Sequence, residues 1–162
     1  MEPRKLPQNV PAEELINLLP HKGKMFLLDH LTQHDTVART LESESLVTKN
    51  HIFYDEALDG IPSHVAFELI AQSISALSGV TGCERGEPAK PGFLLSLQNY
   101  QAHAESFKAG TSVHCVIKKI DELENMMTYS GVAYSSEDPE KPVVETVITV
   151  METTDLRVLG EN

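Results

Sequence analysis

The sequence predicts a single α+β domain of 162 residues, in which an antiparallel sheet wraps around one dominant helix. Two observations carry this prediction. The segment from Val65 to Gly82 has the composition of a long helix that is apolar on almost every side. After it, four strand-like segments follow one another with no convincing helix between them, as in an antiparallel meander.

The segments before the long helix are shorter. Residues 1–10 are polar and contain two prolines, so we expect a flexible lead-in. Ala12 to Leu19 has the apolar spacing of a short amphipathic helix, which the next proline closes. Met25 to Leu31 is an apolar run typical of a buried strand. Thr36 to Val47 alternates loosely and is rich in Thr, Ser and Val, which favours a second strand.

The long helix follows an irregular stretch, Asn50 to Ile61, which predicts a loop. Ser63 comes after Pro62 and fits the N-cap of the helix. The strands expected after the helix are Phe93–His103, Thr111–Ile120, Met126–Tyr134 and Val143–Glu152. Because the helix has almost no polar face, we expect the sheet to cover one side and a partner subunit to cover the other.

Composition limits the possible partners. Thirteen basic and twenty-four acidic residues give a net charge of −11, which argues against nucleic acid and against an anionic membrane surface. The first residues lack an apolar segment, and the longest apolar stretch is interrupted by polar residues. We therefore expect no signal peptide, no membrane span and a cytoplasmic location. Cys83 and Cys115 are too few for a disulfide scaffold, and no histidine pair has metal-ligand spacing, so no metal is predicted.

Glu68 is the first candidate for chemistry, because it is the only ionisable residue from Val65 to Gly82. Ionising a carboxyl group on a buried helix is costly. We therefore expect Glu68 to stay protonated near neutral pH and to be able to donate a proton. Gln72 and Ser75 lie four and seven residues further on, along the same stripe. An alternative stays open, in which Gln72 or backbone groups hold Glu68 for a purely structural purpose.

The start of the helix is the second candidate. The amides of His64 and Val65 lack acceptors within the helix and can hold a carbonyl oxygen that gains negative charge. An ordinary capped helix start is the alternative. His51 opens the loop that leads to this helix and can act as a base near neutral pH, with His64 as its competitor. We expect His21, at the end of the first helix, to cap carbonyl groups.

Three segments carry a resemblance to a known family: LLPHKGKMFLLDHL (18–31), GIPSHVAFELIAQ (60–72) and FLLSLQNYQAHAESFKAGTSV (93–113). Together they resemble the 3-hydroxyacyl-[acyl-carrier-protein] dehydratases of the hotdog fold, and most closely a divergent branch found in aryl-polyene-type pigment clusters. The resemblance extends from Leu18 to Glu152. It implies a hotdog fold and dimerisation edge to edge, with the histidine and the acid of each site on different protomers.

The resemblance also implies roles for single residues. Glu68 matches the catalytic acid, and Ser63 takes the place of the glycine whose amide polarises the thioester carbonyl. The family's His-Phe-Pro-Gly motif is absent, because Tyr54 stands fourteen residues before the acid and the nearest upstream histidine is His51. The resulting hypothesis is elimination of water from a 3-hydroxyacyl thioester without a cofactor. In it His51 removes the C2 proton and Glu68 protonates the leaving hydroxyl.

The remaining expectations concern the substrate site and the partners. Residues expected to bind the substrate are Ser63, His64, Val65, Tyr54 and Gln72. The implied substrate is a thioester of an acyl carrier protein or coenzyme A, and the implied assembly is a homodimer or a heterodimer with a related hotdog subunit. Since both carriers are anionic, docking needs a basic patch. Lys22 and Lys24 are favoured over the other candidates, which are Arg85, Lys90, Lys108, Lys118 and Lys119.

Two other functions remain open at this point. One is a non-catalytic partner subunit of a hetero-oligomeric dehydratase, which the missing His-Phe-Pro-Gly motif favours. The other is an acyl thioesterase of the same fold, in which an acid activates water.

Overall fold

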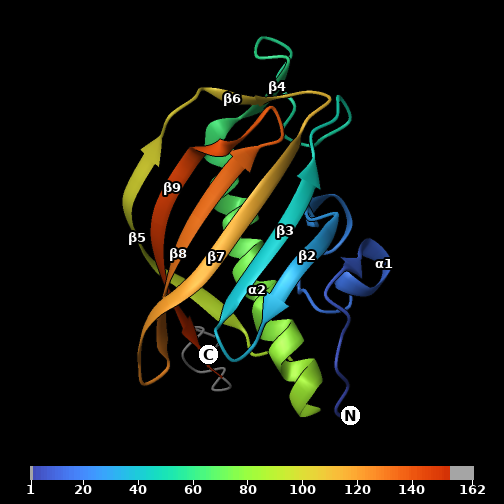
Figure 1. Cartoon of the computed structure of the whole chain (residues 1–162), viewed down its shortest axis with the longest axis vertical. Helices are drawn as coiled ribbons and strands as arrows, with labels where there is room; N and C mark the ends of the chain where they lie inside the picture. The colour runs from blue at the N-terminus through green and yellow to red at the C-terminus, as the bar shows by residue number, and fades with distance from the viewer. Residues whose placement is uncertain (1, 154–162) are drawn as a thin grey trace, which may run out of the picture.

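An antiparallel sheet curves around one long helix in the computed structural model, which describes residues 2–153 (Figure 1). Within those residues the sheet has seven strands, in the spatial order β1 (Val10–Pro11), β2 (His30–Asp35), β3 (Thr40–Leu46), β7 (Ser112–Leu123), β8 (Met126–Ser135), β9 (Asp138–Glu152) and β5 (Gly92–Ala102). A smaller sheet joins β4 (Gly60–Pro62) to β6 (Ser106–Lys108). The helical segments of this part of the chain are α1 (Ala12–Leu15), α2 (Ala66–Arg85) and the 3₁₀ turns η1 (Gly23–Met25) and η2 (Ser63–Val65).

The predicted fold class is confirmed, since the long helix is wrapped by an antiparallel sheet. The four strands predicted after the helix are present as β5, β7, β8 and β9, although β9 begins five residues earlier than expected, at Asp138. The sequence does not predict β1, β4 or β6, because segments of two or three residues carry no readable periodicity.

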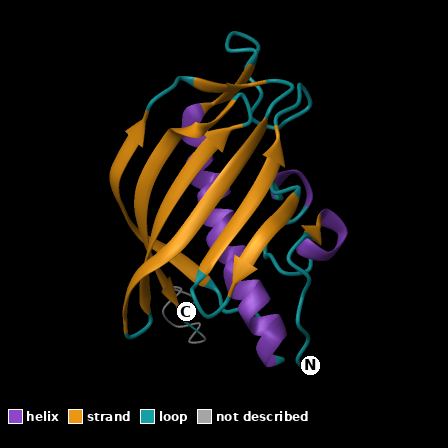
Figure 2. Ribbon diagram, viewed as in Figure 1, coloured by secondary structure: helices purple, strands orange, loops and turns teal. Residues whose placement is uncertain are grey.

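Helix α2 runs along the concave side of the sheet (Figure 2). Leu69, Ile70 and Leu77 are fully buried in the core between helix and sheet. Each such side chain stabilises the fold by about 1.5–3 kcal/mol. Gly131 of β8 allows a close approach, because a Cβ atom there would lie 2.5 Å from the Cγ2 atom of Ile70. The apolar composition of the helix therefore serves its burial against the sheet.

One stripe of α2 is not covered by the sheet. Phe67, Ala71, Ser75 and Ser78 recur at helical spacing and are only half-buried. Among the described residues, the segment Ser63–Arg85 is long and apolar enough to cross a membrane by length and composition, yet 67% of its apolar window is buried within the protein. A core helix passes the same test. The open stripe is the face for which the sequence predicts a second cover.

Strand β5 forms an edge of the large sheet. Its one neighbour there is β9, with Leu97 opposite Ile148. Leu94, Leu95 and Leu97 of this edge strand are 50%, 47% and 42% exposed. Long, apolar edge strands of this kind are ready to pair with another chain.

The segment from Met25 to Leu31 differs from its prediction. It forms η1 and an extended stretch, and regular pairing begins only with β2 at His30. The reason is that hydrogen bonds to side chains replace strand pairing in this segment. The Leu27 N–H donates to the side chain of Gln72, and the carboxylate of Asp29 accepts from the Leu46 N–H. This irregular segment is one wall of the site described below.

The first residues also differ from their prediction as a flexible lead-in. Leu6 and Val10 are buried, and the Arg4 N–H donates to the carbonyl oxygen of Cys83 near the end of α2. His34 of β2 contacts the same first residues. Its N–H donates to Gln8 Oε1, and its Nε2 lies 2.7 Å from the Pro7 carbonyl oxygen. The composition is polar, but these specific contacts fix the segment against the core.

Candidate active site

Glu68 lies in the first turn of α2, where its side chain is 29% exposed. One turn further on, Gln72 is completely buried. The Nε2 group of Gln72 donates to Glu68 Oε1 at 3.2 Å and to the Met25 carbonyl oxygen at 2.7 Å. Its Oε1 accepts from the Leu27 N–H at 3.0 Å. Both ends of the amide are thereby fixed by the chain itself.

These hydrogen bonds make Gln72 a structural support of the site. The two N–H donors and the oxygen of its amide all have partners within the protein, and no part of the residue is exposed. The expectation that Gln72 contacts the substrate therefore does not fit the geometry. Instead, Gln72 ties the irregular segment at Met25 and Leu27 to the carboxylate on the helix.

His21 is the second neighbour of Glu68, and the sequence does not single it out. Its Nε2 atom lies 3.6 Å from Glu68 Oε1, and its Nδ1 atom is buried with no hydrogen-bond partner in the described part of the chain. The capping role expected for His21 is wrong, because the adjacent Lys22 fills it. The Lys22 ammonium group donates to the carbonyl oxygens of Ile16 and Leu19. The contact between His21 and Glu68 joins distant parts of the chain, so no local pattern announces it.

The contacts distinguish the two oxygens of Glu68. Gln72 and His21 both meet Oε1, whereas Oε2 has no hydrogen-bond donor or basic group against it within residues 2–153. The Gln72 amide makes Oε1 a hydrogen-bond acceptor. Oε2 is therefore the oxygen of this carboxyl that is left without a polar contact among residues 2–153. The partial exposure of Glu68 also means that the complete burial expected from the sequence is not reached.

His51 lies in the loop between β3 and β4. Its Nδ1 accepts a hydrogen bond from the Phe53 N–H at 3.1 Å, and its Nε2 is buried with no hydrogen-bond partner among residues 2–153. Burial lowers the pKa of His51, against a weaker opposing effect of the Asp29 carboxylate. The ring lines a cavity of about 470 Å³, whose other walls are Lys24, Phe26, Leu27, Asp29, Leu46, Thr48, Asn50 and Ile52.

The cavity beside His51 and the surroundings of Glu68 share one wall. Leu27 donates its N–H to Gln72 and also lines the cavity, while Met25 bonds to the same glutamine. No hydrogen bond or ion pair joins His51 directly to Glu68 within the described chain. The two predicted catalytic residues are therefore neighbours of the same irregular segment without being partners of each other.

The start of the helix differs from what the resemblance implies. The Ser63 N–H donates to the carbonyl oxygen of Glu105 at 2.9 Å, next to the pairing of β4 with β6. This amide is thus not free to hold a substrate carbonyl, so the expected role of Ser63 does not fit. His64 is exposed and Val65 is buried at the same turn.

Tyr54 stays within its own loop. Its hydroxyl group donates to Asp59 Oδ1 at 2.7 Å, and this hydrogen bond raises the pKa of Tyr54. The contact occupies the hydroxyl donor, so the structure gives Tyr54 no contact with the Glu68 cluster.

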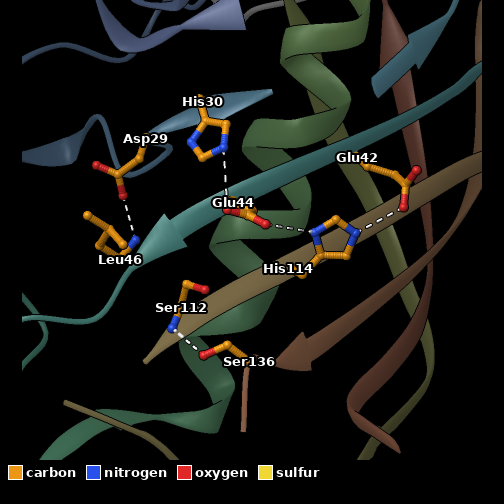
Figure 3. A network of polar contacts seen from close by, with 8 residues as sticks. All are labelled: Asp29, His30, Glu42, Glu44, Leu46, Ser112, His114 and Ser136. Carbon is orange, nitrogen blue, oxygen red and sulfur yellow. Dashed lines mark hydrogen bonds and ion pairs between the residues drawn. The ribbon is translucent and has the colours of Figure 1, made fainter. Parts of the chain in front are cut away.

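Other histidines are engaged on the outside of the sheet. Figure 3 shows His30 of β2 beside Glu44 of β3, and His114 of β7 between Glu42 and Glu44. His114 Nε2 lies 2.9 Å from Glu42 Oε1. Residues 2–153 contain no group of three or more His, Cys, Asp or Glu side chains that could hold a metal ion. These pairs are cross-strand contacts that link neighbouring strands.

The basic residues are dispersed. Lys24 borders the cavity beside His51, whereas Lys22 is held by the end of α1 and Lys108 donates to the Leu58 oxygen. Near the last turn of α2, four basic side chains surround a cavity of about 400 Å³ together with an equal number of glutamates: Arg39, Arg85, Lys90 and Lys119, with Glu87, Glu122, Glu124 and Glu152. Of the two lysines favoured from the sequence, Lys24 is therefore the one that borders the candidate site, and it has no ion pair or hydrogen bond through its side chain with residues 2–153.

The fold and the comparisons define first a class and then a family. An antiparallel sheet wrapped on one long helix is the hotdog fold, and solved structures of that fold match the chain. The dehydratase heterocomplex ApeI:P from Xenorhabdus doucetiae matches with a TM-score of 0.79 and 18% identity, covering 90% of this chain and 95% of that one. Streptococcus mutans smu.793 bound to acetyl CoA matches with a TM-score of 0.62 and 12% identity, covering 85% and 97%. The Escherichia coli PaaI protein of the phenylacetic acid degradation operon matches with a TM-score of 0.57 and 9% identity, covering 75% and 80%.

At these identities the structural matches establish the fold. The family follows from the sequence, because the family model described as "ApeP-like: ApeP dehydratase" matches residues 13–161. The chain belongs to the ApeP-like dehydratase family. No curated protein matched the sequence.

Proposed function

We propose that this dehydratase eliminates water from a 3-hydroxyacyl thioester, borne by an acyl carrier protein or coenzyme A, to give a trans-2-enoyl thioester for fatty-acid or polyene-type biosynthesis. The single observation that carries the proposal is the carboxyl group of Glu68. Gln72 donates a hydrogen bond to its Oε1, His21 Nε2 lies 3.6 Å from the same oxygen, and its Oε2 has no polar partner among residues 2–153 and is available to transfer a proton. Elimination at a 3-hydroxyacyl thioester needs a group that can protonate the leaving hydroxyl.

The proposed reaction needs no cofactor, because the thioester itself acidifies the C2–H bond. Glu68 delivers a proton to the departing C3 hydroxyl through Oε2. His51, on the cavity that shares the wall at Leu27, is the second catalytic residue of the proposal. The acyl chain and thioester would lie along the irregular segment between these two side chains, with Lys24 at the rim of the cavity to meet an anionic carrier.

A second hotdog subunit is part of the proposal. The open stripe of α2 and the exposed leucines of β5 are apolar surfaces of the kind that subunits bury. The match to a structure described as a dehydratase heterocomplex supports such a partner.

A non-catalytic subunit is the second candidate, and one observation favours it. The Ser63 amide, which the dehydratase resemblance assigns to the thioester carbonyl, is bonded to Glu105 instead. A chain with this arrangement could support the active site of another subunit without having a complete site of its own.

The experiment measures reactions of the purified chain, alone and mixed with a related hotdog subunit, on 3-hydroxyacyl and 2-enoyl thioesters of carrier protein and coenzyme A. We expect Glu68→Gln to lower turnover by about 10³-fold, within the range for loss of a general acid. The exposed Glu140→Gln is the matched control and should keep wild-type turnover. Full activity of Glu68→Gln would refute the proposal. Release of free thiol would indicate a thioesterase, and activity that depends only on the partner's residues would indicate the non-catalytic subunit.

A further inference from the structure

The tautomer of His51 is fixed by a backbone contact. A neutral imidazole has one nitrogen that donates a hydrogen bond and one that accepts. The Phe53 N–H donates to Nδ1 of His51, so Nδ1 is the accepting nitrogen. The proton of the neutral ring must therefore be on Nε2. A base needs the opposite arrangement, with an unprotonated nitrogen directed at the substrate.

The Nε2 atom is also without a partner. It is buried and makes no hydrogen bond within residues 2–153. Buried hydrogen-bond donors nearly always have an acceptor, so the missing acceptor of the His51 Nε2–H suggests that a ligand supplies it. Burial lowers the pKa of His51, which keeps the ring neutral at neutral pH and makes the tautomer decisive. The ring lines the cavity whose wall continues, through Leu27, to the Glu68 cluster.

The carbonyl oxygen of the substrate lacks the donor that the resemblance provides. The Ser63 amide is committed to the Glu105 oxygen, so it cannot stabilise charge on the thioester. Loss of the C2 proton places negative charge on that oxygen, and a preorganised donor is needed there. Besides the helix-start amides of His64 and Val65, the buried Nε2–H of His51 is a donor that can meet this oxygen, and it has no other partner among residues 2–153.

We propose that His51 donates its Nε2–H to the thioester carbonyl oxygen, and that Glu68 alone transfers the proton between C2 and the leaving hydroxyl. This inference rests on the proposed function and reassigns the role of His51 from base to hydrogen-bond donor. A ligand carbonyl at Nε2 requires a small outward movement of the surrounding side chains, since Nε2 is covered in the free chain.

The proposed steps balance. The C2–H bond breaks and its proton passes to Oε2 of the Glu68 carboxylate. The electron pair is held as an enolate, whose oxygen accepts the Nε2–H of His51. The pair then forms the C2=C3 bond while the C3–O bond breaks, and the leaving oxygen takes the proton from Oε2 and departs as water. Glu68 returns to the carboxylate, and His51 keeps its proton throughout.

The first test reads the tautomer directly and does not depend on turnover. Nitrogen-15 NMR of histidine-labelled protein, with the His51 signals assigned by their loss in His51→Gln, should show a protonated Nε2 and an unprotonated Nδ1 above the pKa of the ring. Adding the 3-hydroxybutanoyl thioester of N-acetylcysteamine should shift the Nε2 signal. A protonated Nδ1, or an Nε2 signal unmoved by saturating thioester, would overturn the inference.

The second test separates donor from base by substitution. Glutamine can place an N–H near the position of Nε2 but cannot act as a base, whereas alanine can do neither. We expect His51→Gln to stay within about tenfold of wild-type kcat, and His51→Ala to lose about 10²–10³-fold, the usual cost of one oxyanion donor. The surface residue His103 supplies the control, His103→Gln, which should be unchanged. Equal losses in the Gln and Ala variants would mean that His51 is the base.

The two proposals fail in different ways. Full activity of Glu68→Gln contradicts the dehydratase mechanism, whatever the NMR tautomer. Conversely, an inactive Glu68→Gln combined with equally inactive His51→Gln and His51→Ala leaves the dehydratase in place and removes only the donor role. If no mixture dehydrates any thioester, the response of the His51 Nε2 signal to the thioester still decides the inference.

Discussion

Glu68 and His51 border the same irregular segment, but the chain supports them in opposite ways. Glu68 stands on a helix of twenty residues, and its neighbour Gln72 bonds to Met25 and Leu27, which are far away in the sequence. His51 is held by the amide of Phe53, two residues away, in a turn where the His51 N–H donates to Thr48. One residue depends on the tertiary fold and the other on a local turn.

The difference concerns what each residue can do without unfolding the protein. Bonds between distant segments break only when large parts of the structure open, whereas a local turn can rearrange at low cost. The proton-transferring carboxyl is therefore fixed, and the ring that meets the substrate can adjust. Substitution of Gln72 should change stability and activity together, and substitutions at His51 should change activity with little effect on stability.

The largest effect on stability is expected at Gln72. In Gln72→Leu the Leu27 N–H and the Met25 oxygen lose their partner, and Glu68 loses a donor. Leaving such buried groups unmatched costs about 1–3 kcal/mol each, so we expect the free energy of unfolding to fall by about 3 kcal/mol. Chemical denaturation at fixed protein concentration measures this. The exposed Gln33→Leu should change it by less than about 0.5 kcal/mol. Similar losses in both variants would contradict the supporting role of Gln72.

Much of the fold could be predicted from the sequence because the signals are local. The apolar run from Val65 to Gly82 predicts α2, and the strand-like segments Thr111–Ile120 and Met126–Tyr134 predict β7 and β8 to within three residues of their ends. The prediction of a strand from Met25 to Leu31 is wrong for a non-local reason. The run is apolar, but its Leu27 N–H donates to Gln72 of α2 and its Asp29 carboxylate accepts from the Leu46 N–H, and no pattern within the run reveals these contacts.

The residues of the site also differ in whether local sequence signals reveal them. Glu68 stands out because it is the single ionisable residue in an apolar helix, which is visible in the sequence alone. The contact with His21 is not visible, because it depends on how the chain returns to α2 after α1. The engagement of the Ser63 amide is equally hidden, since it depends on the short pairing of β4 with β6 beside Glu105.

A middle-sized effect is expected at His21, on the fixed side of the comparison. A partly exposed pair of this kind is worth about 0–1 kcal/mol, so His21→Ala should leave stability nearly unchanged. The Glu68 carboxyl would keep Gln72 but lose its second contact. We expect kcat to fall about tenfold with KM unchanged, because a displaced acid weakens the transition state more than substrate binding. A rise in KM at constant kcat would show that His21 binds substrate instead, and His21→Asn should restore part of kcat.

The smallest effect is expected in the pH dependence of stability, on the adjustable side of the comparison. Burial lowers the folded-state pKa of His51 from its ordinary value of 6.5, with the Asp29 carboxylate opposing the shift and Lys24 on the same cavity. Below pH 6.5 the unfolded chain therefore binds a proton at His51 more readily than the folded chain does. The contribution of the neutral His51 ring to the free energy of unfolding is fully present above pH 6.5 and is lost as the pH falls through the folded-state pKa. His51→Gln removes it. The stability of wild type relative to His51→Gln should therefore decline on acidification, measured by denaturation between about pH 7.5 and 5. If the stability of wild type relative to His51→Gln rose at low pH instead, the folded protein would hold His51 as the imidazolium. An imidazolium has no accepting nitrogen for the Phe53 N–H, so the hydrogen bond within the local turn could not support this ring.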